Sequence, residues 1–141
     1  MTPEVATAIE ELRKHFQGKP FQIEEDARGG AFVVIDGVEL QGPYTQADSW
    51  VGFHITHTCP YADVYPHFLR GDLTRRDGAV LGEAMGTGHQ FPQPDALPRN
   101  AKLTSRPAVQ VSRRSNHREP NSALETPLIK LLKVLKWIAS R

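Results

Sequence analysis

Residues 21–58 read FQIEEDARGGAFVVIDGVELQGPYTQADSWVGFHITHT and carry the clearest strand pattern in the chain. Its first part alternates apolar and polar side chains, with Gln22 between Phe21 and Ile23. Such alternation is typical of a strand with one buried face. The glycine pair at 29–30 tolerates the positive φ angles of a tight turn. The stretch therefore predicts a hairpin whose second strand covers residues 31–35.

Further strands are expected downstream of this hairpin. Asp36-Gly37 favours a two-residue turn that leads into a short strand at residues 38–40. Residues 50–58 form the next predicted strand, on which the odd-numbered apolar side chains share one side. Together these segments predict an antiparallel meander of about four strands.

A helix is predicted before the meander. The Thr2 side chain can accept a free backbone N–H, and Pro3 suits the first helical position. Gly18 and Pro20 end the helix. Its apolar residues recur at helical spacing and are expected to face the sheet: Val5, Ile9, Leu12 and Phe16.

A second helix is predicted after the meander, because Thr126-Pro127 repeats the same start signal. The apolar stripe of this helix consists of Leu128, Leu131, Leu132, Leu135 and Ile138. The lysines Lys130, Lys133 and Lys136 are expected outside the stripe. A helix at each end with antiparallel strands between them predicts the α+β class.

Residues 59–107 are rich in Pro, Gly, Asp and Arg and show one short plausible strand, at residues 67–73. A long segment without regular structure is unusual in a compact domain. The segment is therefore either a functional loop or the place of an element that the pattern does not reveal. Residues 108–112 follow it as a short apolar segment.

Composition limits the class of protein. The 141 residues are 39% hydrophobic and 23% charged, which predicts one domain over residues 1–141 that folds in water. The start shows no leader and the apolar stretches are short, so we expect a cytoplasmic protein with no membrane partner. Cys59 is the only cysteine, which excludes an internal disulfide and a cysteine-based zinc site. No cofactor is expected.

Charge is unevenly distributed along the chain. Residues 1–50 hold nine acidic and four basic side chains, whereas residues 101–141 hold two acidic and nine basic ones. A basic end can meet nucleic acid or an acidic protein. The net charge of +1 lacks the strong excess of most nucleic-acid-binding proteins. We therefore expect a protein partner rather than nucleic acid.

Several motifs resemble the ubiquitin-conjugating (E2, or UBC-like) family. GPYT at 42–45, WVGFHI at 50–55 and DVYP at 63–66 resemble the family's Gly-Pro-rich turn, third strand and Tyr-Pro signature. Farther along, QVSRR at 110–114, then Pro120 and the Leu-rich helix resemble prokaryotic E2-like families found beside ubiquitin-like proteins and their activating enzymes. The resemblance implies a UBC-like fold and a role in a bacterial ubiquitin-like protein conjugation pathway.

The chain departs from the family's pattern at the position of the catalytic cysteine. Active members carry a His-Pro-Asn triplet ahead of a cysteine, which lies shortly before a Trp-x-Pro motif. Here HREP at 117–120 stands in the place of Trp-x-Pro, and residues 108–116 contain no cysteine. Cys59 precedes Tyr65-Pro66 instead, in the loop that family members use to contact a ligase. The resemblance thus implies a non-catalytic variant that binds a ubiquitin-like protein, its activating enzyme or a partner subunit.

Histidines supply other chemical candidates. His54 and His57 have a spacing that suggests metal binding, but side chains three apart on a strand point to opposite faces, so no metal site is predicted. His67, His89 and His117 lie in or beside irregular segments, where a histidine can deprotonate an attacking lysine.

Two alternatives therefore remain open beside the non-catalytic interpretation. An active or divergent conjugating enzyme would use Cys59 or a histidine, with Cys59, His89 and His117 as the catalytic candidates. A small nucleic-acid-binding module would use the arginine-rich segment 113–118. For partner binding, the candidates are Cys59, Tyr61, Tyr65, Pro66, Arg113, Arg114 and Arg118.

Overall fold

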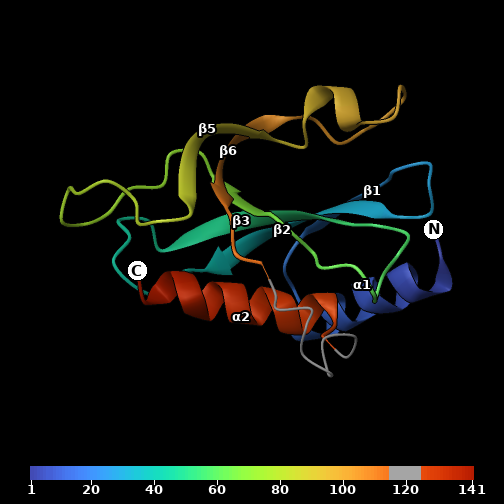
Figure 1. Cartoon of the computed structure of the whole chain (residues 1–141), viewed down its shortest axis with the longest axis horizontal. Helices are drawn as coiled ribbons and strands as arrows, with labels where there is room; N and C mark the ends of the chain where they lie inside the picture. Colours follow the sequence, from blue (N-terminus) through green and yellow to red (C-terminus); the bar gives the residue numbers. More distant parts are fainter. Residues whose placement is uncertain (115–124) are drawn as a thin grey trace.

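The computed structural model describes residues 1–114 and 125–141. These residues form two α-helices, a short 3-10 helix and six strands, which Figure 1 shows in chain order. The elements are α1 (Pro3–His15), β1 (Phe21–Glu25), β2 (Ala31–Glu39), β3 (Asp48–Ile55), β4 (His67–Arg70), β5 (Met85–Phe91), η1 (Pro94–Ala96), β6 (Arg106–Val111) and α2 (Pro127–Ala139). The predicted α+β class is confirmed.

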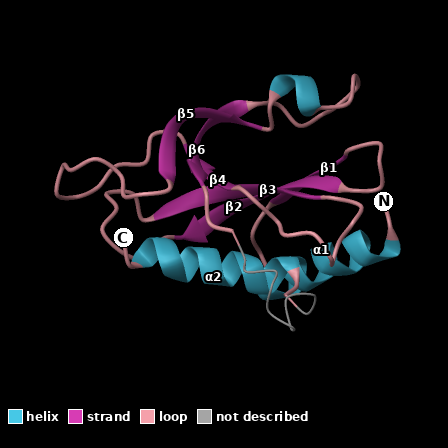
Figure 2. Cartoon of the chain, viewed as in Figure 1, coloured by secondary structure: helices cyan, strands magenta, loops and turns pink. Residues whose placement is uncertain are grey.

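The strands form an antiparallel sheet in the order β1-β2-β3-β4-β6-β5 (Figure 2). The first four strands follow chain order as an antiparallel meander, as predicted, but the strands expected at residues 31–35 and 38–40 form the single strand β2. The sheet has six strands rather than about four, because a hairpin of β5 and β6 joins it beside β4.

Strand β5 lies inside the segment that was expected to be mostly irregular. Its sequence, MGTGHQF, contains two glycines and mostly polar residues, and only Met85 and Phe91 at its ends are buried. The strand forms an edge of the sheet, and its pairing with β6 shifts register between Gly86 and His89. An edge strand needs no continuous apolar face, which is why the alternation signal is absent.

Strand β2 continues through the predicted turn at Asp36-Gly37. Its pairing with β3 shifts register between Ile35 and Val38, and Gly37 has a φ of 70°. A bulge can take up an extra residue with positive φ while the strand keeps its direction. The prediction of a reversal at this position was therefore wrong.

Both helices lie on one face of the sheet (Figure 1), and the main apolar core fills the space between the layers. The opposite face carries a second apolar cluster, over which part of the segment between β5 and β6 packs. This cluster consists of Phe32, Val34, Phe68, Phe91, Leu103 and Ala108. Within the described ranges, neither helix is long and apolar enough to cross a membrane.

Helix α1 begins as predicted. The Thr2 hydroxyl accepts the backbone N–H of Val5 at 3.2 Å, and Pro3 occupies the first turn. The side chains of Val5, Ile9 and Leu12 are buried, and Phe16 packs partly against the core. The predicted apolar face of this helix is confirmed.

Helix α2 also begins as predicted, and Leu131 and Ile138 of its predicted stripe are buried, but its inward face differs from the prediction at two positions. The buried residues are Pro127, Lys130, Leu131, Val134 and Ile138. Leu132 was expected inside and is 37% exposed, whereas Lys130 was expected outside and is 2% exposed. Leucines occur on more than one side of this helix, so apolar spacing alone did not fix the buried face.

The C-terminal end of α2 is tied to the loop after β2. The Tyr44 hydroxyl donates a hydrogen bond to the carbonyl oxygen of Ile138 at 2.8 Å, and both residues are buried. Gly42 has a φ of 102°, and a Cβ atom at this position would lie 2.5 Å from the Ala139 carbonyl oxygen. Glycine is therefore required where this loop passes the helix end.

Candidate functional site

The loop between β3 and β4 carries the first group of predicted site residues. Its backbone turns at Thr56, whose carbonyl oxygen accepts the N–H of Cys59 at 3.0 Å. Of the two predicted site residues in this loop, Tyr61 is 77% exposed and Cys59 is 8% exposed. Tyr61 is thus available to a partner, whereas the Cys59 thiol is largely covered.

Cys59 lies between α1 and the first turn of α2. It borders a cavity of about 330 Å³ whose wall includes Glu4 and Glu11 of α1 and Pro127 of α2. Burial raises the pKa of the Cys59 thiol, and the negative charges of Glu4 and Glu11 raise it further. The thiolate is the nucleophilic form of cysteine, so this environment lowers the reactivity of Cys59.

A buried ion pair lies on the other side of the same loop. The Lys130 ammonium donates a hydrogen bond to the Asp63 carboxylate at 2.7 Å, and both side chains are largely buried. Removing a charge from water is costly unless a partner compensates it, and Asp63 supplies that partner. The pair explains why Lys130 can occupy an inward position of α2.

His67 begins strand β4 and is 0% exposed. Its ring lies 5.3 Å from the Phe53 ring, and neither ring nitrogen has a hydrogen-bond partner within the described part of the chain. Burial lowers the pKa of His67 to about 3, and the nearby positive charge of Lys130 adds to the effect. His67 is therefore neutral near pH 7 and is closed to substrates.

Strand pairing brings Tyr65 to the end of β6. His67 of β4 pairs with Val111 of β6 in antiparallel register, so Tyr65, two residues earlier, lies beside the residues that follow Val111. The Arg114 guanidinium lies over the Tyr65 ring, 4.4 Å from the ring centre. Interactions with Arg114 and then with Ser112 lower the pKa of Tyr65.

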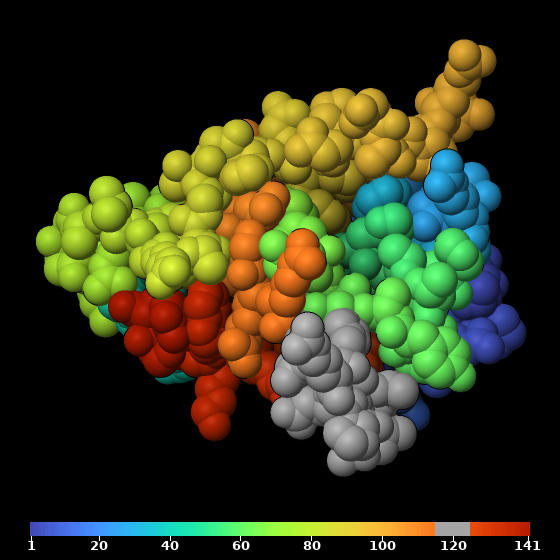
Figure 3. All heavy atoms as spheres, in the orientation of Figure 1, coloured from blue at the N-terminus to red at the C-terminus, as the bar shows by residue number. Residues whose placement is uncertain are grey.

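A second aromatic ring, that of Trp137 on α2, lies near Arg113. The guanidinium carbons of Arg141 and Arg113 lie 4.3 and 5.7 Å from the centre of the Trp137 ring. In Figure 3 the end of the β6 segment, in orange, lies beside α2, in red. We call the group formed by Tyr65, Arg113, Arg114, Trp137 and Arg141 the arginine–aromatic surface.

The other candidate histidines lie in different environments. His54 bonds to the Asp26 carboxylate at 2.7 Å and stacks on Phe32, whereas His57 lies exposed in the turn after β3. His89 is half-buried on the edge strand β5. Among the described residues, no three His, Cys, Asp or Glu side chains group as a metal site. His117 and Arg118 lie outside the described residues.

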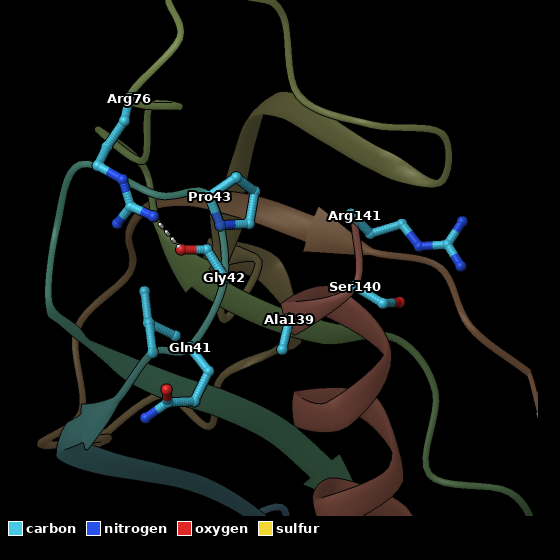
Figure 4. Close-up of a pocket in the computed structure, with 8 residues that line it drawn as sticks. Gln41, Gly42, Pro43, Arg76, Ala139, Ser140 and Arg141 are labelled. Atoms are coloured by element: carbon cyan, nitrogen blue, oxygen red, sulfur yellow. Dashed lines mark hydrogen bonds between the residues drawn. The ribbon is translucent and has the colours of Figure 1, made fainter.

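A cavity of about 610 Å³ lies at the C-terminal end of α2 (Figure 4). Arg76 points into the loop beside it and donates to the carbonyl oxygens of Gly42 and Tyr44, at 2.9 and 3.0 Å. Arg141 also lines the cavity, and its side chain extends away from Gly42 and Pro43. Arg76 thus holds the loop, and Arg141 belongs to the arginine–aromatic surface.

The structure brings together only some of the predicted site residues. Tyr65, Arg113 and Arg114 meet at one surface, whereas Cys59 faces α1. Sequence reasoning missed the roles of Trp137 and Lys130. Lys130 lies four residues before Val134 and eight before Ile138, and this helical spacing indicates that the three residues share a face.

The geometry gives one thiol that is buried, one histidine that is buried and neutral, and a surface of arginines stacked on aromatic rings. Comparisons with protein-family models, with curated proteins and with solved structures find no match.

Proposed function

We propose that this chain is an E2-like component of a bacterial ubiquitin-like protein conjugation pathway. In this role it binds a ubiquitin-like protein, its activating enzyme or a partner subunit, and it does not carry a thioester on Cys59. The proposal rests on Cys59, the only thiol in the chain, because this residue is buried and its pKa is raised.

The order of elements supports a UBC-like domain. Helix α1 precedes the meander β1 to β4, Tyr65-Pro66 directly precedes β4, and both helices lie on one face of the sheet. By the resemblance, the family places its catalytic cysteine in the segment that leads to the C-terminal helices. In this chain the corresponding stretch includes β6 and residues 112–114, and it contains no cysteine.

The environment of Cys59 supports a non-catalytic role. Transfer of a ubiquitin-like protein to a cysteine requires an accessible thiolate that attacks the incoming thioester. Cys59 is buried, and both its burial and the carboxylates of Glu4 and Glu11 favour the protonated thiol. A catalytic cysteine needs the opposite conditions, namely exposure and nearby positive charge.

A charging assay tests the proposal. The protein is incubated with ATP, a bacterial ubiquitin-like protein and the activating enzyme of that protein, and intact masses are measured with and without reductant. We expect a thioester on the activating enzyme, as positive control, and none on this chain. A reductant-sensitive adduct that disappears in Cys59→Ser would establish an active conjugating enzyme instead.

The binding part of the proposal has its own measurement. Isothermal titration of the purified chain with the same ubiquitin-like protein and with the activating enzyme should show a complex with at least one of them. Cys59→Ser should bind as the wild type does, because the thiol is largely covered and was a partner-binding candidate on sequence grounds alone. Absence of binding to both proteins contradicts these two roles and leaves only binding to a partner subunit.

A further inference from the structure

The arginine–aromatic surface presents guanidinium groups in fixed positions. Arg114 lies over Tyr65, and Arg113 and Arg141 lie over Trp137. A guanidinium stacked on a ring keeps its N–H edge available for a second, bidentate contact. Stacking also restricts the long side chain before a partner arrives, which reduces the entropy lost on binding.

These guanidinium groups lack a carboxylate partner within residues 1–114 and 125–141, where the ion pairs involve other cations. Nearby acidic side chains are already engaged, since Asp63 bonds to Lys130 and Glu125 bonds to Lys133. The surface therefore carries positive charge that the described part of the fold does not neutralise.

The chemistry of the surface favours carboxylates over nucleic acid. Proteins that bind single strands offer exposed aromatic faces on which bases stack. Here the guanidinium groups lie over Tyr65 and Trp137, and the ion pairs of Lys130 and Lys133 reduce the positive charge of α2. Planar guanidinium groups match carboxylates in bidentate geometry.

We propose that the arginine–aromatic surface is a docking site for a segment rich in Asp and Glu on a partner protein. This inference goes beyond the proposed function, because it assigns a binding site and a ligand chemistry that the charging assay does not test. The peptide assay below contains no pathway protein, so the two proposals can fail independently.

Fluorescence of Trp137 provides a direct readout. The chain has two tryptophans, so Trp50→Phe leaves Trp137 as the only tryptophan emitter. Trp50 stacks on Phe91 on the far face of the sheet, and phenylalanine retains an aromatic contact there. The probe is a synthetic peptide of alternating glutamate and glycine, compared with the same peptide carrying glutamine in place of glutamate.

Matched charge variants locate the site. In the Trp50→Phe background, Arg113→Gln with Arg114→Gln removes two charges from the surface, and Arg28→Gln with Arg99→Gln removes two from exposed positions elsewhere. We expect the first pair to weaken glutamate-peptide binding about tenfold or more, since charged hydrogen bonds are lost. The control pair should change binding by less than about twofold, because salt screens distant charges.

Several outcomes overturn the inference. The inference fails if the glutamate peptide does not bind, if the glutamine peptide binds equally well, or if the two double variants have equal effects. It also fails if the peptide binds but leaves the Trp137 emission unchanged. Tighter binding of an oligothymidine strand than of the glutamate peptide at physiological salt would assign the surface to nucleic acid. Circular dichroism verifies that each variant is folded. If the double variant is unstable, the single variant Arg114→Gln replaces it in the binding assay.

Discussion

Acidification should destabilise this protein through His67. The ring is fully buried, and its pKa falls from the ordinary value of 6.5 to about 3 in the folded state. The unfolded chain therefore binds the proton more readily than the folded chain does. This contribution to stability is complete above about pH 6.5 and is lost as the pH falls toward the folded pKa.

The size of the effect follows from the two pKa values. At about pH 5, which is about 1.5 units below the ordinary pKa, protonation of this residue stabilises the unfolded state by RT ln(1 + 10^1.5). The folded state remains almost entirely neutral at this residue. The difference is about 2 kcal/mol of unfolding free energy relative to neutral pH. His67→Phe removes this titration and keeps a ring beside Phe53.

Urea unfolding at about pH 7.5 and about pH 5 measures this difference. The wild type should lose about 2 kcal/mol more than His67→Phe between these pH values, and His57→Gln, at an exposed position, should behave as the wild type. Equal pH dependence in wild type and His67→Phe would refute the reasoning. If the variant does not fold, an NMR titration of the wild type decides, because a His67 ring that protonates near pH 6.5 contradicts it.

Other substitutions test the packing by chemical denaturation. Lys130→Met removes the ammonium that neutralises Asp63 and should cost about 3–5 kcal/mol, whereas Lys133→Met on the exposed side should cost no more than about 0.5 kcal/mol. Equal losses would contradict the buried pair. Leu12→Ala should cost about 2–5 kcal/mol, and an unchanged midpoint would place the apolar face of α1 elsewhere. Tyr44→Phe should cost about 1 kcal/mol, and no loss would mean that its hydrogen bond to α2 adds nothing.

Local signals in the sequence were enough to predict the elements that have strong helix caps or a clear alternation of apolar and polar residues. Thr2-Pro3 and Thr126-Pro127 mark both helix starts, and alternation from Phe21 onward marks the first hairpin. Strand β5 carries no such signal, because an edge strand with two glycines is stabilised by pairing with β6 rather than by its own apolar face.

The candidate site depended on longer-range information. Tyr65, Arg113 and Arg114 were identified as separate candidates, but their meeting depends on the pairing of β4 with β6. The inward position of Lys130 likewise depends on Asp63, which comes from a distant loop. Spacing along one helix can indicate which residues share a face, but it does not show which face finds a compensating charge.

The place of β6 between β4 and β5 bears on the order in which the chain folds. Strands β1, β2 and β3 each pair with their neighbour in sequence, so their contacts are local. Pairing of β4 with β6 requires closure of residues 71–105, and the entropic cost of closure rises with loop length. We therefore expect this pairing to form after the first three strands. Because the arginine–aromatic surface depends on it, a partly folded chain would already hold its first hairpins while lacking the surface that meets an acidic partner.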